Sequence, residues 1–457
     1  MIGRLALRSL SAHPIRSVVL AVGFGAGVAV MAILLGVAEI VLAQAQAPAL
    51  VGGGDVLIRL GTGVPARLVL DGTLQSDALR PRVRTASPFH TTDLYLLRDD
   101  GTRVRVGARA GIPSLERAIG DAETSGVAAW RDTAADVAWS RDTPDRVLRQ
   151  IDRFHPIPEA PEWAASWAEW LYFNGRAGDT RFYLTFLAGA RTADGRRPAG
   201  VRLQLDRGAG VESFTASATL SDEDADRAPD LTIGANTVRL DGMRYRIHLQ
   251  LNDNAGRTVT GDLVLEASAG RLVPPIEMAG ARGWVTGYVV PVMSGRLDGV
   301  LTVGSDRVPL ANGSGYHDHN WGFWQGVSWQ WGQVQHGDLS LLYGRVFPPR
   351  EAADPERMPG FVGLLGPDGP IGYATDVQIA ETNDASGRPA QIAIRARGAG
   401  LQLSVRFDVA STVRSSGTLG SGLDFLQMRG QYTVQGRAAN RDVNFTAPGA
   451  AETFRGR

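Results

Sequence analysis

The sequence predicts a mainly β protein, in which two β-barrels in tandem follow a single transmembrane helix and a small mixed α+β segment. Two observations carry this prediction: a long apolar stretch near the N-terminus, and many short alternating segments, without helices between them, from residue 163 to the end. A chain of 457 residues has room for two or three domains, and its hydrophobic content of 44% is that of a globular protein.

Charge and cysteine content exclude several classes of function. Arg and Lys together number 47, as do Asp and Glu, so the formal net charge is zero. Nucleic-acid-binding proteins carry a basic excess, so nucleic acid is not expected as a partner. The chain contains no cysteine, which excludes disulfides, thiolate nucleophiles, Cys-ligated zinc and a lipoprotein anchor.

Residues 18–43 form the apolar stretch, which contains one charged residue, Glu39. About 20 apolar residues span a bilayer, so residues 1–50 are predicted to be a membrane anchor with one transmembrane helix. The arginines within 4–16 are expected to stay in the cytoplasm, which places the rest of the chain on the periplasmic side of the inner membrane. A cleaved signal peptide is the alternative, and it predicts the same compartment.

The N-terminal sequence also carries a family resemblance. Residues 4–37, followed by 52-GGGDVLI-58, resemble the first helix of the permease subunits of MacB/FtsX-type ABC transporters and the start of their periplasmic domain. The resemblance covers about the first sixty residues, and no second hydrophobic span follows. It therefore implies a permease N-terminus reused as an anchor, with ABC transporter subunits as partners.

The segment 51–155 is predicted to be a small mixed α+β unit. Residues 56–108 alternate with the period of strands, and 93-DLYLLRDDGTRVRV-106 predicts a hairpin with its turn at residues 99–101. The segment is either a remnant of a permease's periplasmic domain or a spacer that lifts the barrels from the membrane.

Residues 112–155 change to helical period. Thr143 and Pro144 predict a helix start, because Thr is a preferred N-cap residue and Pro is favoured at the first helical position. The Pro-rich run 156–162 is the predicted domain boundary.

From residue 163 onward, turn residues separate short alternating segments, which indicates sandwiches or barrels. The stretch is too long for one small barrel, so we predict two, residues 163–295 and 296–457. The break is expected near Pro291 to Gly295, with a hairpin at 299–310. Further strands are predicted at 181–187, 213–220, 245–251, 401–407 and 431–436.

The stretch 313-GSGYHDHNWGFWQGVSWQWG-332 concentrates acid, imidazole and indole side chains. In an extended strand, His317 and His319 lie on one face, so they could bind a metal with His336 or an acid as the third ligand. Two histidines beside an acid could equally orient that acid, and the prediction favoured here is that no metal or cofactor is bound.

Asp318 and Tyr316 share the other face, and they suggest acid–base chemistry. An Asp in an apolar pocket is costly to ionise, so its pKa rises and it can carry a proton. Indoles would stabilise a carbocation formed by protonation of a carbon–carbon double bond. The alternative is structural: Asp318 accepts backbone N–H bonds and the tryptophans form a barrel core. The tryptophans that follow are Trp321, Trp324, Trp329 and Trp331.

The motif 315-GYHDHNWG-322 resembles the signature of the hydroxyneurosporene synthase (carotenoid 1,2-hydratase) family and its AttH-like relatives. The segment 168–189 resembles the opening E-W-W-Y strand of that family, with Leu171 in place of the second Trp. The resemblance covers about residues 163–457 and implies two lipocalin-like barrels. Known activities in the family include cofactor-free hydration of acyclic carotenoid ends and, in cousins, Diels–Alder cyclisation.

Carried over by position, the resemblance places the family's catalytic residues on Tyr316 and Asp318. This sequence departs from the family's pattern in residues 284–292. The family's hydratases have a His-x-Trp pair there, whereas the nearest aromatic residues in this chain are Trp284 and Tyr288. This departure weakens carotenoid hydration as the literal activity.

Two functions are therefore predicted. In the first, a membrane-anchored protein binds a hydrophobic lipid- or isoprenoid-like molecule beside an ABC transporter. The alternative is a cofactor-free hydratase in which Asp318 donates a proton to an isoprenoid double bond, with Tyr316 orienting that acid or the water. The expected ligand contacts are Trp170, Tyr172, Trp321, Trp324, Trp329 and Trp331. The residues expected to support the acid are His317, His319 and Asn320.

Overall fold

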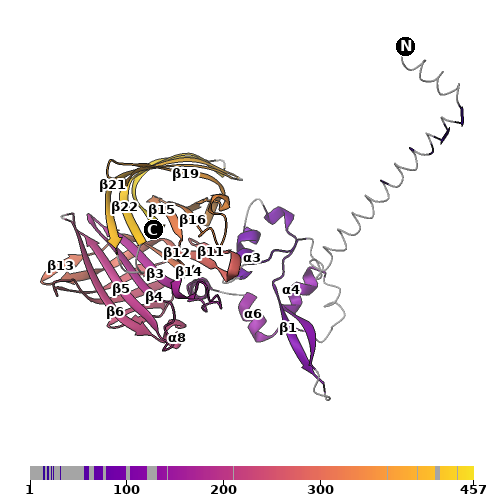
Figure 1. Cartoon of the computed structure of the whole chain (residues 1–457), viewed down its shortest axis with the longest axis horizontal. Coiled ribbons are helices and arrows are strands. Elements are labelled where there is room, and N and C mark those ends of the chain that lie inside the picture. Colours follow the sequence, from indigo (N-terminus) through magenta and orange to yellow (C-terminus); the bar gives the residue numbers. More distant parts are fainter. Residues whose placement is uncertain are drawn as a thin grey trace, which may run out of the picture. The chain divides into compact units, whose positions relative to one another are not determined.

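The computed structural model (Figure 1) describes residues 14–15, 18–19, 22, 24, 31, 56–60, 66–75, 79–98, 103–120, 131–140, 143–208, 210–367, 369–398, 400–416, 423–439 and 441–456. The chain divides into two compact units, one of residues 1–59 and 69–141, the other of residues 60–68 and 142–457. Nearly all of the predicted span 18–43 lies outside the described residues. Among those that are described, no helix has the length and apolar character needed to cross a membrane.

The hairpin predicted at 93–106 is confirmed and is longer than expected: β1 (Phe89–Leu97) pairs antiparallel with β2 (Arg103–Gly111). Helix α4 (Pro113–Ala118) packs against this hairpin through Glu116. The buried Glu116 carboxylate accepts hydrogen bonds from Arg109 Nη2 on β2, at 2.6 Å, and from Ser87 Oγ just before β1, at 2.8 Å. The helical elements before residue 142 are α3 (Ala66–Gln75), the 3-10 turn η2 (Arg80–Arg82), α4 (Pro113–Ala118) and α6 (Ala134–Ser140).

Eight antiparallel strands of the second unit close into a first barrel (Figure 1). They are β3 (Trp167–Ala177), β4 (Thr180–Gly189), β5 (Arg197–Asp206), β6 (Val211–Leu220), β9 (Arg244–Asn252), β10 (Thr258–Glu266), β12 (Val285–Val303) and β14 (Gly313–Phe323). The hydrogen-bonded order is β10-β12-β14-β3-β4-β5-β6-β9, and β9 pairs with β10 to complete the ring. Four short strands extend this sheet: β7 (Thr232–Ile233), β8 (Asn236–Asp241), β11 (Val273–Ala279) and β13 (Asp306–Pro309).

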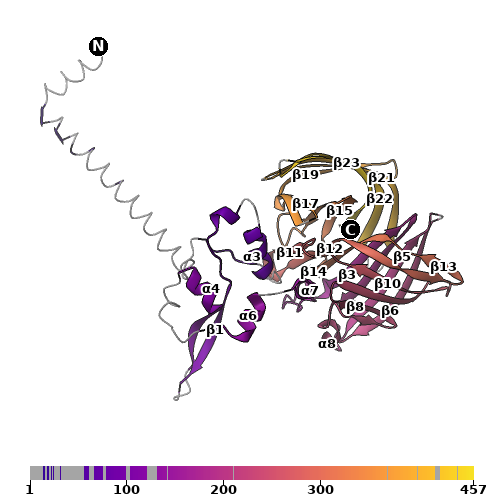
Figure 2. The same cartoon turned by 180° about the vertical axis from the view of Figure 1, so that it is seen from behind.

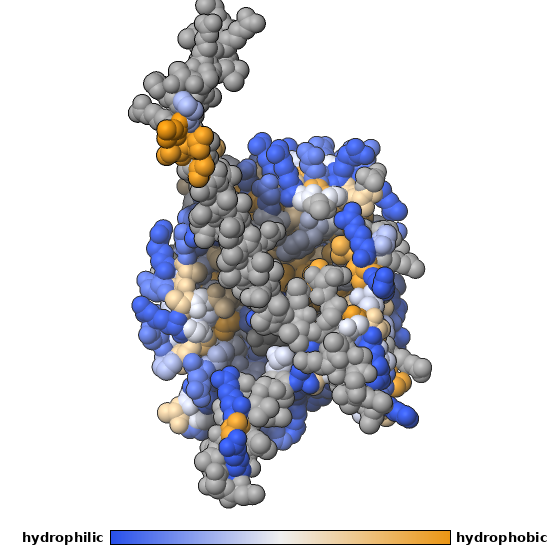
Figure 3. Space-filling view, turned by 90° about the vertical axis from the view of Figure 1, so that its right-hand side faces the viewer, coloured by the Kyte–Doolittle hydropathy of each residue, from blue (hydrophilic) through white to orange (hydrophobic). Residues whose placement is uncertain are grey.

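Strict alternation explains why these sequences form a barrel wall. Along β9, exposed and buried residues alternate without exception, with Tyr245, Ile247 and Leu249 buried. The apolar face fills the barrel while the polar face meets water, and the described surface visible in Figure 3 is mostly hydrophilic. The hairpin predicted at 299–310 is also present, as β12 paired with β13.

A second antiparallel sheet of nine strands follows and arches over its own interior in both views (Figures 1 and 2). Its strands are β15 (Ser328–His336), β16 (Leu339–Phe347), β17 (Phe361–Gly366), β18 (Gly369–Ala374), β19 (Asp376–Asn383), β20 (Pro389–Gly398), β21 (Leu401–Ser416), β22 (Leu423–Ala438) and β23 (Arg441–Gly456). Their order is β18-β17-β16-β15-β23-β22-β21-β20-β19. The prediction of a mainly β fold with two barrel-like sheets is thus confirmed.

The division between the sheets differs from the predicted break at residue 295. Strand β12 continues through Pro291 and Gly295, where its register with β14 shifts. These residues mark bulges that bend a long strand and do not end a domain. As a result, the motif strand β14 lies in the first sheet, not in the second barrel where the sequence placed it.

Helix α7 (Pro144–Ile151) has Thr143 as its N-cap residue, as predicted. Leu148 and Ile151 are buried in the same core as the first barrel, and Phe154 joins them. The second unit therefore begins before the Pro-rich run 156–162 that was predicted as the boundary. The short helical elements further on are η3 (Ala164–Ser166), α8 (Asp222–Ala225), η4 (Ala281–Gly283) and η5 (Pro355–Arg357).

Candidate functional site

Strand β14 presents two chemically different faces. Tyr316, Asp318 and Asn320 lie on one face, whereas His317 and His319 lie on the other, as the period of a strand requires. The histidine face packs into the first barrel, and Phe173 stacks on His317 with ring centroids 4.1 Å apart. The acid face meets the second sheet.

A cavity of about 680 Å³ lies between the two sheets, on the acid face of β14. Its walls come from β3, β4, β5, β6, β12 and β14 of the first sheet and from β15, β16, β22 and β23 of the second. The sequence predicted an apolar pocket around Asp318 and assigned the motif 315–322 to the second barrel. The structure places Asp318 instead in a space that neither barrel forms alone.

Asp318 is almost completely buried, with 3% of its surface exposed. Asn320 Nδ2 donates to its Oδ1 at 2.7 Å, and the Tyr316 hydroxyl also bonds to the carboxyl group. Trp331 Nε1 donates to that hydroxyl at 3.0 Å. Burial raises the pKa of Asp318 well above its usual range, and the nearby Glu452 carboxyl raises the pKa further. Asp318 is therefore suited to carry a proton near neutral pH.

Glu452, on β23, supplies a second carboxyl group to the same cavity. Burial raises its pKa to about 7, although hydrogen bonds with Tyr172 and Gln427 oppose the rise. Gln427 Nε2 also lies 3.4 Å from the Tyr172 hydroxyl. Two protonatable acids, one from each sheet, thus face a shared space. Each has a tyrosine as a hydrogen-bond donor.

Aromatic rings form much of the remaining wall. Trp170 and Trp324 have ring centroids 4.7 Å apart, and Trp329 stacks on Phe454 at 4.2 Å. Trp324 Nε1 donates to the Ala168 carbonyl at 2.8 Å, which satisfies its polar atom and fixes the ring. Of the expected ligand contacts, the cavity wall contains Trp170, Tyr172, Trp324, Trp329 and Trp331.

Trp321 does not reach this cavity, although we expected it to contact the ligand. Its alternation along β14 points it into the first barrel, where it stacks on His155 with centroids 3.9 Å apart. Tyr316 is also absent from the wall and lies behind Trp331, which accounts for its 1% exposure. It remains in place to support the Asp318 carboxyl.

His317 and His319 do not hydrogen bond to Asp318; His319 acts on this acid only through its charge, which lowers the pKa of Asp318. Their hydrogen-bond partners lie on the barrel side of β14. His317 Nε2 lies 3.0 Å from Asp152 Oδ2, and His319 Nδ1 lies 3.1 Å from Asp152 Oδ1. Asn320, the third residue of that set, does contact the acid.

These histidines belong to a fully buried ionic network. His319 Nε2 lies 2.9 Å from Glu169 Oε1, and the Tyr245 hydroxyl donates to Asp152 at 2.8 Å. Burial lowers the pKa of His319, but its bonds to Asp152 and Glu169 outweigh that and raise the pKa to about 9. Burial opposes ionisation of Asp152, while His317 and His319 bring its pKa down to about 2. The network fastens the segment after α7 to the barrel wall.

A metal site from His317, His319 and His336 is not assembled. His336 stacks on Phe445 with centroids 4.9 Å apart and lines a different cavity. Among the described residues, the group with metal-ligand proximity is His155, Glu169 and His319, whose ligand atoms lie within 4.8 Å of one another. Glu169 Oε1 there already meets the backbone N–H of His155 at 2.8 Å and both imidazoles. Glu169 Oε2, by contrast, is buried without a hydrogen-bond partner, so the bonds within the group use only one of the two carboxylate oxygens.

Glu452 and Asp152 were missed by sequence reasoning. Glu452 lies in an alternating strand, where its position predicts a solvent-facing side chain, and the packing of the two sheets leaves it half-buried. Asp152 follows the apolar stripe of α7 and looks like an ordinary helix-end acid. No local pattern distinguishes either residue.

Comparison with known proteins gives similarities to solved structures. Kievitone hydratase from Nectria haematococca is 14% identical with a TM-score of 0.43, over 66% of this chain and 93% of that one. CghA in complex with Sch210972 is 12% identical with a TM-score of 0.39, over 69% of this chain and 95% of that one. No family model matches the sequence, and no curated protein matches it significantly. The family resemblance of residues 315–322 therefore stays a prediction.

Proposed function

We propose that this protein binds a hydrophobic lipid- or isoprenoid-like molecule in the cavity between its two sheets. The observation that carries the proposal is the wall itself: indole and phenyl rings from both sheets surround a space of about 680 Å³. Pockets for small organic ligands span about 300–1,000 Å³ and are mostly apolar with few polar groups. Each Å² of apolar surface that such a ligand buries contributes about 25 cal/mol.

The first experiment identifies the ligand. The full chain is purified in detergent, and mass spectrometry detects apolar molecules that accompany it. Thr185 lines the cavity, so Thr185→Phe should reduce their amount because the added ring fills ligand space. Thr382→Phe is the matched control, since Thr382 lies exposed on β19. If nothing apolar accompanies the wild type, and neither geranylgeraniol nor oleate binds after delipidation, the proposal fails.

A second candidate function, a cofactor-free hydratase, is favoured by the two protonatable acids. In this reaction the Asp318 O–H bond breaks and its proton goes to one carbon of a double bond. The other carbon becomes cationic beside Trp170 and Trp331, and water adds to it. The Glu452 carboxylate then accepts the proton that the added water loses, so charge and atoms balance.

Isotope incorporation separates this candidate from ligand binding alone. Wild type, Asp318→Asn and Glu452→Gln are each incubated with geranylgeraniol or another isoprenoid in ¹⁸O-water. Hydration requires ¹⁸O in the product from the wild type, and Asp318→Asn should abolish it while ligand still binds. A wild type that incorporates no ¹⁸O into any isoprenoid leaves only the binding function.

We also propose that the chain is anchored in the inner membrane, faces the periplasm and works beside an ABC transporter. The apolar stretch of residues 18–43, with Glu39 as its one charged residue, is the observation that supports the anchor. Fractionation with protease protection tests the anchor, and crosslinking in membranes followed by mass spectrometry tests the partner. Release of the chain from membranes by an alkaline wash would contradict the anchor. Crosslinks that contain no transporter subunit would contradict the ABC transporter as a partner.

A further inference from the structure

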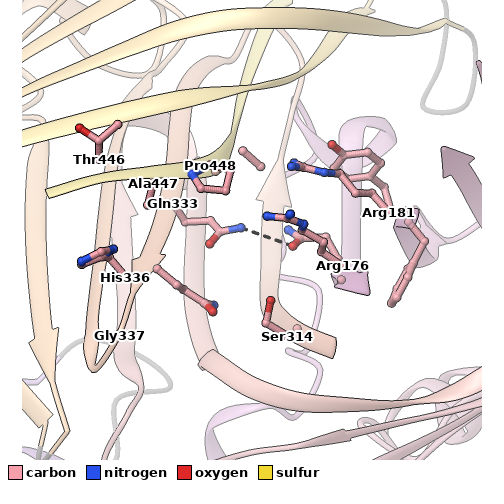
Figure 4. Close-up of a pocket in the computed structure, with 17 residues that line it drawn as sticks. Arg176, Arg181, Ser314, Gln333, His336, Gly337, Thr446, Ala447 and Pro448 are labelled. Atoms are coloured by element: carbon pink, nitrogen blue, oxygen red, sulfur yellow. Dashed lines mark hydrogen bonds between the residues drawn. The ribbon is translucent and has the colours of Figure 1, made fainter. Parts of the chain in front are cut away.

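A second cavity, of about 330 Å³, lies between the same two sheets (Figure 4). Arg176 and Arg181, at the turn between β3 and β4, form its first-sheet side together with Ser314. Gln333 and His336 of β15 lie across from them. The cavity is thus a separate space with a polar lining.

Positive charge dominates this lining. The residues that line the cavity include two arginines but no carboxylate. Among the described residues, neither Arg176 nor Arg181 lies within 4.0 Å of an acidic oxygen, whereas the nearby Asp206 pairs with Arg429. The charge of Asp206 raises the pKa of Arg181, but Asp206 lies outside the lining. Two guanidinium groups that share a concavity with no carboxylate in its lining favour an anion there.

The two arginines are held close enough to interact. Arg176 Nε donates to the Gly178 carbonyl at 2.9 Å, which directs the side chain along the turn. Arg181 is half-buried, and burial lowers its pKa, as does the positive charge of Arg176. An anion between them would relieve this repulsion.

Neutral donors complete the lining. Gln333 Nε2 donates to Asn174 Oδ1 at 3.3 Å, a bond drawn in Figure 4. Ser314 and His336 are both exposed. A hydroxyl, an imidazole and two guanidinium groups are the donors that phosphate and carboxylate oxygens accept from.

We propose that this cavity binds an oxyanion, a phosphate or carboxylate group. Tyr183 lines this cavity as well as the larger apolar one. The anion is therefore either a free ion or the polar head of an amphipathic molecule whose apolar part occupies the larger cavity. The site goes beyond the proposed function, since an anion can bind here whether or not the larger cavity holds a ligand.

Calorimetry on the full chain in uncharged detergent tests the proposal. The probes are inorganic phosphate, dodecyl phosphate and, as an uncharged comparison, dodecanol. Phosphate or dodecyl phosphate should bind the wild type, and the double variant Arg176→Gln/Arg181→Gln should lose at least about tenfold in affinity. Arg181→Lys should retain part of the binding, because it keeps the charge but loses the planar guanidinium.

The matched control is Arg307→Gln, which removes an exposed arginine on β13 that does not line the cavity. It should bind like the wild type, and thermal unfolding should show that all variants fold. Comparable binding of phosphate and dodecyl phosphate identifies a free anion. Much tighter binding of dodecyl phosphate than of phosphate or dodecanol identifies a head group. The proposal is overturned if neither phosphate compound binds, or if the double variant binds both as tightly as the wild type.

Discussion

Replacing Glu452 by Gln should make the protein more stable above pH 7 and leave its stability near pH 4.5 unchanged. The pKa of this carboxyl rises from an ordinary 4.5 to about 7, chiefly through burial. Such a group binds its proton more tightly in the folded state. Its contribution to stability is therefore complete below pH 4.5 and is lost as pH rises to about 7. Gln cannot ionise, so the stability of the variant does not fall between pH 4.5 and pH 7 on account of this residue.

The magnitude follows from the pKa values. One pKa unit corresponds to about 1.36 kcal/mol, so the rise from 4.5 to about 7 amounts to about 3 kcal/mol as an upper value. Glu452→Gln should gain up to about that much at pH 8 relative to the wild type. The amide keeps an oxygen that accepts from the Tyr172 hydroxyl, so few contacts change.

Urea unfolding of delipidated protein at half-unit steps from pH 4 to pH 9, followed by tryptophan fluorescence, measures this difference. His319 acts in the same direction but in a higher window, because its pKa rises from 6.5 to about 9. Asp152, with its pKa lowered to about 2, contributes evenly across the whole range. Wild type and Glu452→Gln curves that run parallel between pH 4.5 and pH 7 would refute the reasoning.

Three further predictions concern the packing around the cavity and the barrel. Asp152→Asn should destabilise the fold by about 3–5 kcal/mol, because it removes the buried carboxylate that bonds both His317 and His319 and leaves Glu169 as the remaining carboxylate partner of His319. The matched control Asp262→Asn, in the exposed pair with His248, should change unfolding little, and equal losses would contradict the distinction. Trp329→Ala should weaken the binding of geranylgeraniol measured by fluorescence, because Trp329 lines the cavity. Trp321→Ala should lower stability and leave that affinity unchanged, since Trp321 lies on the other face of β14. The reverse pattern would show that the two faces of β14 are wrongly assigned. Gly287→Ala should lower the free energy of unfolding by about 1–3 kcal/mol, measured by heat or urea, because a Cβ atom there would lie 2.3 Å from the Trp321 ring. An unchanged free energy of unfolding would show that the ring can move aside and would contradict this prediction.

The strands could be predicted from sequence because their cause is local. Alternation of apolar and polar residues marks β9 and the hairpin of β12 with β13, and the structure has both. The same period places Asp318 and His319 on opposite faces of β14. The sequence argument erred where it allowed both faces to serve one site, although a pleated strand keeps them apart.

The remaining features depend on contacts between distant segments. Asp152 pairs with histidines about 165 positions away in the chain, and Glu452 meets Asp318 only because the two sheets pack together. The predicted break near Gly295 failed for a related reason. Pro and Gly can end a strand or bend it, and only the pairing of β12 with β14 decides between these outcomes.

The state of one carboxyl group at neutral pH decides the site's chemistry. Infrared difference spectra between wild type and Asp318→Asn at pH 7 report it directly, because a protonated acid and a carboxylate absorb at separate positions. The burial of Asp318 beside the apolar cavity predicts that the wild type shows a protonated-acid band that Asp318→Asn lacks. A carboxylate band for Asp318 at pH 7 would contradict both the effect of burial on this acid and its role as proton donor.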